Sequence, residues 1–329
     1  MGVFAFYDTE TDDTVYHVTP DPQPDEEVPF EHETDSSTSD MTICTDDLPG
    51  YFVLHNGRQQ PANSNVARWF PSDNVRRFIL RSLASKWIFG GSYVGPVKEA
   101  LAPLAERRRK ALELGTRAGT WVQDMAKEFP HVDFRTLDVA PIIAHAPCSN
   151  ITFEVYDFTN GILLPDNSQD AVFLNTVFEL VKDYRALLRE AHRVLRPGGL
   201  LYINDFNPHL WDTQNASIPA HRTNPVGCQL FDLARTQISK FGIDPDTCDK
   251  LPRWLAPSSK LWKNRQDGGF DGIQTIMKAY PAYPHEGFPC SLKLDPRMAP
   301  FMAHLSVMAT RDMFSILRDS GMSLSAVRC

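Results

Sequence analysis

Two patterns of hydrophobic and polar positions alternate along residues 72–206. Five short runs rich in aliphatic and β-branched residues are typical of buried strands, and the stretches between them repeat apolar positions every three or four residues, as helices do. The strand-like runs are 109–115, 131–138, 151–157, 170–175 and 200–206, and the helical patterns are 72–89, 120–130 and 183–199. Strands that alternate with helices predict a doubly wound α/β fold with a parallel sheet.

Capping residues mark the ends of two of these helices. Ser72 is a suitable N-cap for the first helix, which Gly90-Gly91 ends. Asp183 is a suitable N-cap for the helix at 183–199, which Gly198-Gly199 stops.

Charge and composition divide the chain into four regions. Residues 1–50 hold 14 of the 41 acidic residues and no Lys or Arg, and they are rich in Pro, Ser and Thr. Such a segment cannot bury enough apolar surface to order itself, so we expect a mostly disordered tail that either solubilises the protein or contacts a partner. The predicted regions are a tail (1–48), a helical N-terminal lid (49–108), the core (109–206), and a substrate cap with the C-terminal part of the sheet (207–329).

Composition indicates the cellular compartment in which we expect the protein. No run of about 18 apolar residues exists, so no membrane association is expected, and the N-terminus does not resemble a signal peptide. The six cysteines are scattered, which favours a reducing compartment and argues against both a zinc site and a disulfide framework, and we expect no metal. We therefore expect a cytoplasmic protein, or a nuclear one if the basic run 107–110 is an import signal, and no nucleic-acid binding.

Polar residues and glycines gather where the predicted strands end. Ligands of doubly wound sheets bind beyond the carboxyl ends of the strands, so these residues are the first candidates for a site. Asp138 follows Gly115 by 23 residues, close to the spacing of about 20 at which an acidic residue binds ribose hydroxyls. The other candidates are Glu113, Gly119, Asp157, Phe158, Asn175 and Asp205.

The segment "LLPDNSQDAVFLNTVFELVKDYRALLREAHRVLRPGGLLYIND" at 163–205 identifies a family. It resembles the second half of class I S-adenosylmethionine-dependent methyltransferases, which have a Rossmann-like sheet. The phrases "FPSDNVRRFIL", "FGGSYVGPV" and "LDVAPI" resemble the fungal LaeA-like branch of that family, and the likeness spans residues 65–320. The loop "ALELGTRAGTW" lacks a full G-x-G-x-x-G, which disfavours a dinucleotide.

The resemblance implies roles for matching residues. Gly115 and Gly119 would border the methionine end of S-adenosylmethionine, and Glu113 matches the acid that begins the family loop. Asp138 would bind the ribose hydroxyls. The remaining implied contacts are Val139 against the adenine, Asp157 at the adenine amine with Phe158 beside it, Asn175 near the methionine portion or the methyl group, and Thr116 and Arg117 within the loop.

Arg117 departs from the family, which usually has glycine there. A side chain at positive φ costs on the order of 1–2 kcal/mol. Its guanidinium would point to solvent, pair with the methionine carboxylate, or oppose the positive sulfonium. We expect it to turn outward or towards the methionine carboxylate, with the cofactor still bound.

The C-terminal third raises two further expectations. Residues 268–283 are a candidate sixth strand and 300–320 a helix; if nothing pairs beyond them, the open sheet edge would admit a homodimer or a protein partner. An oxygen acceptor needs a base, for which His209 is better placed than His145 or His221.

These observations favour a methyltransferase acting on a small molecule in fungal secondary metabolism. The alternative is a methyltransferase-like protein without methyl transfer, either a regulatory binding partner or a catalyst of a different reaction, because Arg117 would then block the cofactor space.

Overall fold

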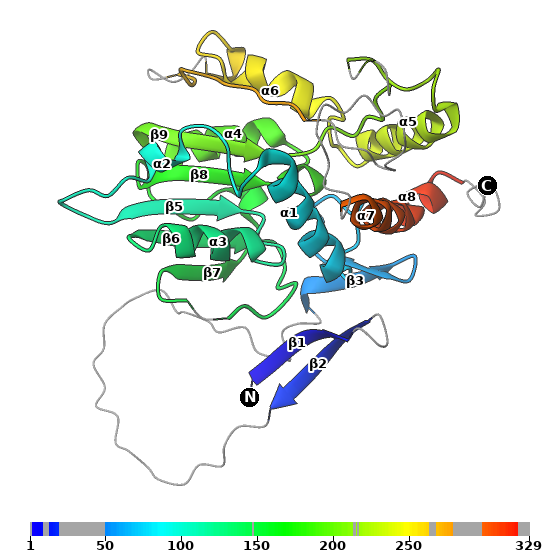
Figure 1. Cartoon of the computed structure of the whole chain (residues 1–329), viewed down its shortest axis with the longest axis horizontal. Helices are drawn as coiled ribbons and strands as arrows, with labels where there is room; N and C mark the ends of the chain where they lie inside the picture. Colours follow the sequence, from blue (N-terminus) through cyan, green and yellow to red (C-terminus); the bar gives the residue numbers. More distant parts are fainter. Residues whose placement is uncertain are drawn as a thin grey trace.

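A five-stranded parallel sheet lies at the centre of the chain (Figure 1). The structure is a computed structural model that describes residues 2–8, 13–19, 50–146, 148–212, 215, 217–262, 268–278 and 298–321. The strands are β5 (Arg109–Leu114), β6 (Val132–Asp138), β7 (Ile151–Val155), β8 (Gln169–Asn175) and β9 (Leu195–Asn204), in the spatial order β7-β6-β5-β8-β9. All four neighbouring pairs are parallel, so the predicted doubly wound, Rossmann-like sheet is confirmed.

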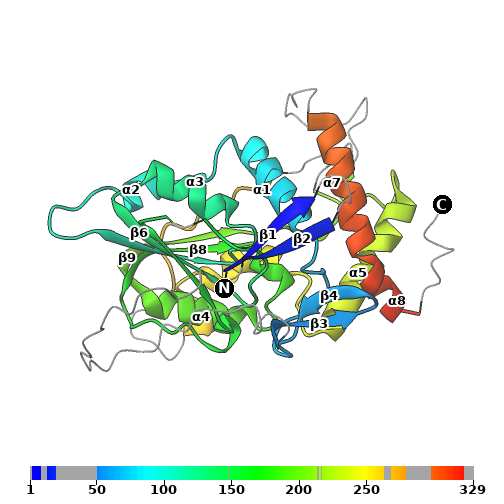
Figure 2. The same cartoon turned by 90° about the horizontal axis from the view of Figure 1, so that it is seen from below.

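Two helices cover the two faces of the sheet, α3 (Thr120–Glu128) on one side and α4 (Tyr184–Val194) on the other (Figure 2). Successive side chains of a strand point to opposite faces, and β5 divides its core residues accordingly. Ala111 packs in one cluster with Val122 of α3, whereas Leu112 packs in another with Leu188 of α4. The sheet is therefore buried on both faces, as a parallel sheet requires.

The order of the strands creates a switch point between β5 and β8. The chain runs from β5 outward through β6 to β7, then returns to lay β8 on the other side of β5. Connections on the two sides leave in opposite directions, which opens a crevice at the carboxyl ends of β5 and β8. Figure 1 shows α1 (Val75–Phe89) at this end of the sheet.

Further helices, turns and a hairpin lie outside the sheet. Before α1 lies a hairpin of β3 (Phe52–His55) and β4 (Arg58–Pro61), and after it α2 (Val97–Ala100). After β9 come α5 (Pro225–Lys240), α6 (Thr247–Leu255), α7 (Met298–Asp312) and α8 (Phe314–Asp319). Short 3₁₀ turns are η2 (Phe158–Asn160), η3 (Val177–Glu179) and η4 (Lys260–Trp262).

Two of the predicted helix ends are wrong and two are confirmed. Asn74, not Ser72, caps α1, because its side chain accepts the Arg77 backbone N–H at 3.2 Å while the Ser72 hydroxyl donates to the Gln59 carbonyl. Gly90 ends α1 at φ 79°, as expected. Asp183 caps α4 as predicted.

The stop at Gly198-Gly199 is the second wrong end. Helix α4 ends at Val194, because Leu195 is already extended and begins β9.

The acidic N-terminal region contains two strands that the sequence reading missed. β1 (Gly2–Asp8) and β2 (Asp13–Thr19) pair antiparallel with one another and form a sheet of their own. Their aromatic and β-branched residues favour strands, and the acids between them masked that pattern. The expected disorder of residues 20–48 falls outside the described residues.

The predicted sixth strand is not present in its described part. Residues 268–278 carry no strand, and 279–283 lie outside the described residues. Gly269 and Gly272 have φ values of 89° and 63°, so this segment turns instead of extending. Among the described strands β9 is an edge, and the helix expected at 300–320 is present as α7 and α8.

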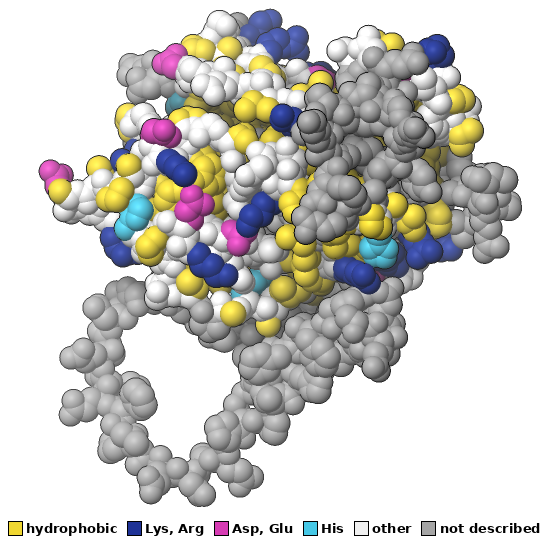
Figure 3. All heavy atoms as spheres, in the orientation of Figure 1, with side chains coloured by type: hydrophobic (Ala, Val, Ile, Leu, Met, Phe, Trp, Pro, Cys, Tyr) yellow, Lys and Arg dark blue, Asp and Glu magenta, His cyan; other side chains and the backbone are white. Residues whose placement is uncertain are grey.

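Many charged side chains on the surface form ion pairs. Basic and acidic side chains lie interspersed on the face shown in Figure 3. The described ion pairs include Lys86–Asp124 at 2.7 Å. Within the basic run, Arg107 and Arg109 bind Asp170, and Arg108 binds Asp133. These arginines brace the amino ends of the strands. In the described ranges, no helix is both long and apolar enough to cross a bilayer.

Candidate functional site

A cavity of about 920 Å³ opens at the carboxyl ends of β5, β8 and β9, and we call it the central cavity. Its walls are α1, the ends of these strands, and residues of the cap that includes α5 and α6. Seven residues singled out from the sequence line it: Glu113, Gly115, Thr116, Arg117, Asn175, Asp205 and His209. The switch point of the sheet therefore leads into a space large enough for a small organic ligand.

Two glycines let the loop after β5 pass close to its neighbours. Gly115 has φ 91°, and a Cβ there would lie 2.4 Å from the Asn175 carbonyl oxygen. Gly119 has φ 67° and precedes the first residue of α3, where a Cβ would lie 2.7 Å from His145 Nδ1. Both positions need glycine for space as well as for backbone conformation.

Glu113, at the end of β5, is buried beneath this loop and hydrogen-bonded to residues of β6 and β8. Its side chain is buried, Oε2 accepts from the Thr136 hydroxyl at 2.6 Å, and Oε1 accepts from Asn175 Nδ2 at 2.8 Å. Burial raises the pKa of Glu113 to about 8, so the carboxyl is mostly protonated at neutral pH. Asn175 Oδ1 is buried without a hydrogen-bond partner, which leaves an acceptor at the wall of the central cavity.

Asp138 is already engaged by the backbone. It is 4% exposed, and its two oxygens accept the N–H groups of Arg117 at 2.7 Å and Val139 at 2.8 Å. Burial raises the pKa of Asp138, and the nearby Arg117 opposes that effect. Neither Asp138 nor Val139 lines the central cavity, although a carboxylate with two bonds retains free lone pairs.

The structure also places Asp157 and Phe158 away from the cavity lining. Asp157 caps η2 and accepts from Asn65 Nδ2 at 3.0 Å and from Asn160 Nδ2 at 2.7 Å. Phe158 is fully buried in the core. Asn65 belongs to the segment before α1, so this N-terminal segment lies over the end of β7.

The Arg117 side chain points inward, so the expected outward orientation is wrong, while the alternative, towards the methionine carboxylate, stays a prediction. The residue is 8% exposed at φ 51°, and its Nη2 donates to the Thr176 carbonyl at 3.2 Å. Its guanidinium lies 3.6 Å from Glu179 and 3.9 Å from Asp138. Arg117 therefore both contacts Asp138 and lines the central cavity.

Two more arginines contact Glu179, and the sequence analysis did not predict them. Arg77 and Arg81 of α1 both bind Glu179. Arg77 also pairs with Asp312 of α7 at 2.7 Å. The four-residue spacing of the two arginines on the core-facing side of a predicted helix was the available signal. We call Arg77, Arg81 and Arg117 the arginine cluster.

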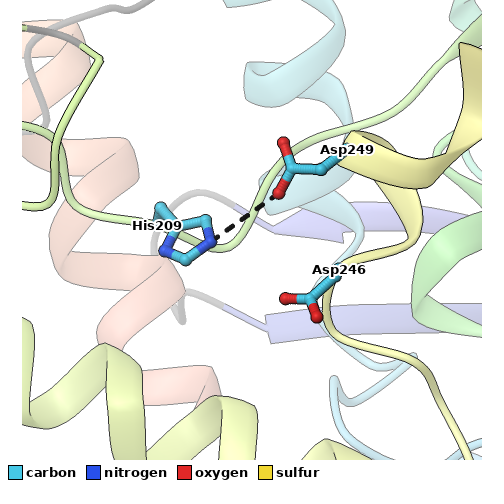
Figure 4. Close-up of side chains that lie close together, drawn as sticks. All are labelled: His209, Asp246 and Asp249. Carbon is cyan, nitrogen blue, oxygen red and sulfur yellow. Dashed lines mark ion pairs between the residues drawn. The ribbon is translucent and has the colours of Figure 1, made fainter.

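His209 lines the central cavity on the side formed by the residues after β9. Figure 4 shows its imidazole pointing towards Asp249, with Asp246 nearby. Its Nε2 lies 3.9 Å from Asp249 Oδ2, and burial, together with Arg235, lowers its pKa. The imidazole is therefore neutral at neutral pH and can accept a proton. His209, Asp246 and Asp249 are close enough to hold a metal, but Asp246 is already bound by Arg235 and Lys250, which weakens that reading.

The other polar residues singled out from the sequence are less suited to proton transfer. His145 stacks on Phe153 at 4.2 Å and is absent from the cavity lining, and His221 is exposed near Asp232. Asp205 reaches the cavity but accepts from the Phe178 N–H and the Tyr184 hydroxyl.

The residues fit S-adenosylmethionine, though not equally at its two ends. The glycine loop and Asn175, which the resemblance assigns to the methionine end, line the central cavity, and the buried Asn175 Oδ1 has no hydrogen-bond partner there. Asp138 and Asp157, which the resemblance assigns to the adenosine end, lie at the strand ends, where Arg117 contacts Asp138 and Asn65 contacts Asp157.

Comparison with known proteins points to one family. The family model described as a methyltransferase domain matches residues 112–203, which span β5 to β9. The "Secondary metabolism regulator laeA" of Coprinopsis cinerea is 25% identical over 241 residues, covering 72% of this chain and 56% of that protein. "Methyltransferase pytC" of Aspergillus terreus is 26% identical over 174 residues, covering 53% of this chain and 49% of that protein.

A solved structure, a SAM dependent methyltransferase from Aquifex aeolicus, is 21% identical with a TM-score of 0.32 and covers 41% of this chain and 76% of that one. The chain spans about half the length of the curated relatives described above. The family match confirms the resemblance noted in the sequence.

Proposed function

We propose that this chain, a member of the S-adenosylmethionine-dependent methyltransferases, transfers a methyl group from that cofactor to a small, largely apolar acceptor. In this proposal residues 49–108 are the lid, 109–206 the cofactor-binding core, and 207–329 the substrate cap. Names of fungal relatives, a regulator of secondary metabolism and methyltransferases, support a place in fungal secondary metabolism.

The central cavity is the observation that carries the proposal. It joins the glycine loop after β5, where the family holds its cofactor, to a wall rich in aromatic and aliphatic residues. That wall includes Trp69, Phe70, Phe206, Trp211, Phe231 and Phe270. An apolar wall favours an acceptor with little charge, and the continuity of the space would let donor and acceptor meet.

His209 is the proposed general base. The cofactor supplies a methyl group on a positively charged sulfur, and an oxygen acceptor must lose a proton when it takes that group. His209 lines the same cavity, is neutral at neutral pH, and has Asp249 nearby to stabilise the imidazolium that forms. Asn207 Nδ2 donates to Asp249 Oδ1 at 2.8 Å and fixes that carboxylate.

The test is methyl transfer from methyl-labelled S-adenosylmethionine to a panel of apolar phenols and carboxylic acids. We expect labelled product with at least one phenol, and a loss of about 10²-fold or more in kcat/KM for His209→Gln. His221→Gln is the matched control and should keep wild-type activity, because His221 is exposed and outside the cavity lining. Equal activity of His209→Gln and wild type would exclude His209 as the base.

Arg117 and Asp138 support a second candidate, a regulatory protein that keeps the fold without methyl transfer. Arg117 contacts the acid expected to bind ribose, and the laeA relative is named a regulator. This candidate predicts neither turnover nor binding of S-adenosylhomocysteine by the wild type, with binding created by Arg117→Gly.

A further inference from the structure

Three residues next to Phe206 line the central cavity and hold buried polar atoms that have no hydrogen-bond partner among the described residues. These atoms are Trp69 Nε1, Arg81 Nη2 and Asn207 Oδ1. Buried polar groups are normally paired, so several unpaired atoms at the wall of one cavity indicate a ligand that supplies the missing partners. Two of the three atoms are N–H donors, and the arginine donor is charged.

The Phe206 ring brings these residues together at the carboxyl end of β9. Arg81 Cζ lies 4.4 Å from the centre of that ring, and the Trp69 ring is stacked on it at 5.8 Å with 16° between the planes. Asn207 follows Phe206 directly. We call Trp69, Arg81, Phe206 and Asn207 the β9 subsite. Because β8 lies between β5 and β9, two strand spacings, about 10 Å, separate the end of β9 from that of β5.

Arg81 supplies the positive charge of the β9 subsite. Its side chain is 17% exposed, and among the described ion pairs it has Glu179 alone. That carboxylate is shared with Arg77 and Arg117. Asp205 also interacts with Arg81, but burial raises the pKa of Asp205 to about 7, so at neutral pH this carboxyl is about half protonated. The charge of Arg81 is therefore only partly compensated, and an anionic ligand would complete the compensation.

A carboxylate matches these two donors. Its two oxygens can accept from the Arg81 guanidinium and the Trp69 indole N–H at once, and a hydrogen bond between charged groups is stronger than one between neutral groups. A neutral carbonyl would leave the arginine without its counter-charge. A phosphate would bring more negative charge than Arg81 can balance beside Glu179. The donor set therefore favours a ligand with a single carboxylate.

His209 lies in the same segment as the β9 subsite. Its backbone N–H donates to the Asn207 carbonyl at 2.8 Å, and this tight turn fixes the proposed base next to the subsite. A neutral imidazole serves as a base only for a group that still has a proton to lose. A carboxylic acid is already ionised at neutral pH, so the atom that accepts the methyl group is a different part of the ligand.

We propose that the methyl acceptor is an aromatic hydroxy acid, held by its carboxylate at Arg81 and Trp69 with its hydroxyl at His209. The inference rests on the proposed function. The hydroxyl oxygen bonds to the methyl carbon, the electron pair of the broken carbon–sulfur bond stays on sulfur, and His209 takes the hydroxyl proton. The carboxylate is unchanged by this step. Arg81 and Trp69 are therefore specificity-determining residues, and the aromatic wall packs against the ring of the acceptor.

The experiment measures kcat/KM for ortho-, meta- and para-hydroxycinnamic acid and for the primary amide of each. The isomers vary the separation of hydroxyl and carboxylate, and each amide keeps the shape but loses the charge. We expect wild type to prefer at least one acid over its amide by about tenfold or more, with the methyl group on the hydroxyl oxygen. Arg81→Gln should reduce this preference at least about fivefold, mainly through KM. Trp69→Phe, which keeps a ring and loses the N–H, should reduce it about threefold.

Arg185→Gln is the control, because it removes an exposed arginine outside the lining of the central cavity and should leave the preference unchanged. Thermal melting verifies that each variant is folded, and Trp69→Phe tests the subsite if Arg81→Gln is not. An unchanged preference in the folded variants, a methyl ester as product, or equal use of acid and amide by wild type overturns the inference, while methyl transfer itself still stands. Failure of wild type both to bind S-adenosylhomocysteine and to methylate any phenol overturns the proposed function and the inference together.

Discussion

At the residue scale, the carboxyl ends of β5 and β8 hold polar side chains whose environments differ sharply. Glu113 is buried between Thr136 and Asn175 and stays largely protonated at neutral pH, whereas Asp138 is bound to loop N–H groups. Sequence spacing located these residues because parallel strands bring their ends to one edge. It could not give the direction of the Arg117 side chain, which depends on Thr176 and Glu179 after β8 and on Phe78 of α1.

Glu113 predicts a specific dependence of stability on pH. Its folded pKa of about 8 lies above the unfolded value, so the folded state binds a proton that the unfolded state has lost between pH 4.5 and 8. The stabilisation from this group is complete below the unfolded pKa and is lost as pH rises through about 8. Glu113→Gln should therefore reduce the fall in unfolding free energy between pH 5 and pH 9 by at least ~2 kcal/mol.

Urea unfolding at a series of pH values measures this difference. Glu128→Gln, a partly exposed carboxyl on α3, is the control and should keep the wild-type profile. An unchanged pH profile in Glu113→Gln would mean that Glu113 is ionised in the folded protein.

At the element scale, the arginine cluster joins helices that are distant in sequence. Arg77 of α1 pairs with Glu179 of η3 and Asp312 of α7, and Asn74 Nδ2 donates to Asp312 at 2.9 Å. The sequence predicted α1 and the helix at 300–320 from their periodicity. It did not predict their contact, because Asp312 lies 235 residues after Arg77 and nothing local marks the pair.

Arg77→Met should destabilise the protein by about 3 kcal/mol, because it removes the buried arginine that pairs with both Glu179 and Asp312 and leaves these carboxylates with fewer partners. Lys98→Met is the control, since Lys98 is exposed and 4.0 Å from its partner Glu128, and it should cost less than about 1 kcal/mol. Denaturant unfolding measures both. A loss below about 1 kcal/mol for Arg77→Met would show that the cluster does not hold α1 to α7.

At the scale of the whole molecule, the parallel sheet and its cap are separable from the N-terminal hairpin. β1 and β2 pair only with one another among the described strands, and they form no part of the central sheet. Composition identified this region as distinct, but the acids hid the strand pattern. We expected a sixth strand at 268–283 from the sequence. The described part of this segment does not extend as a strand, because its backbone turns at Gly269 and Gly272.

Deletion of residues 1–48 should leave the melting temperature of the remaining chain within about 2 °C of the full chain, because the region contributes no strand to the central sheet. Differential scanning calorimetry measures the change. A drop of about 8 °C or more would mean that the acidic region packs against the core and is part of its cooperative unit.

Titration of S-adenosylhomocysteine into the full chain, followed by calorimetry, tests the central claim that the strand ends of this sheet form a cofactor site. The account predicts one site per chain. Asp138→Asn should weaken binding at least about tenfold, because the ribose loses a charged acceptor while one acceptor remains for the loop N–H groups. Asp133→Asn, an exposed acid at the other end of β6, should bind as wild type does. Absence of binding heat in wild type, or equal affinity in Asp138→Asn, would contradict the account.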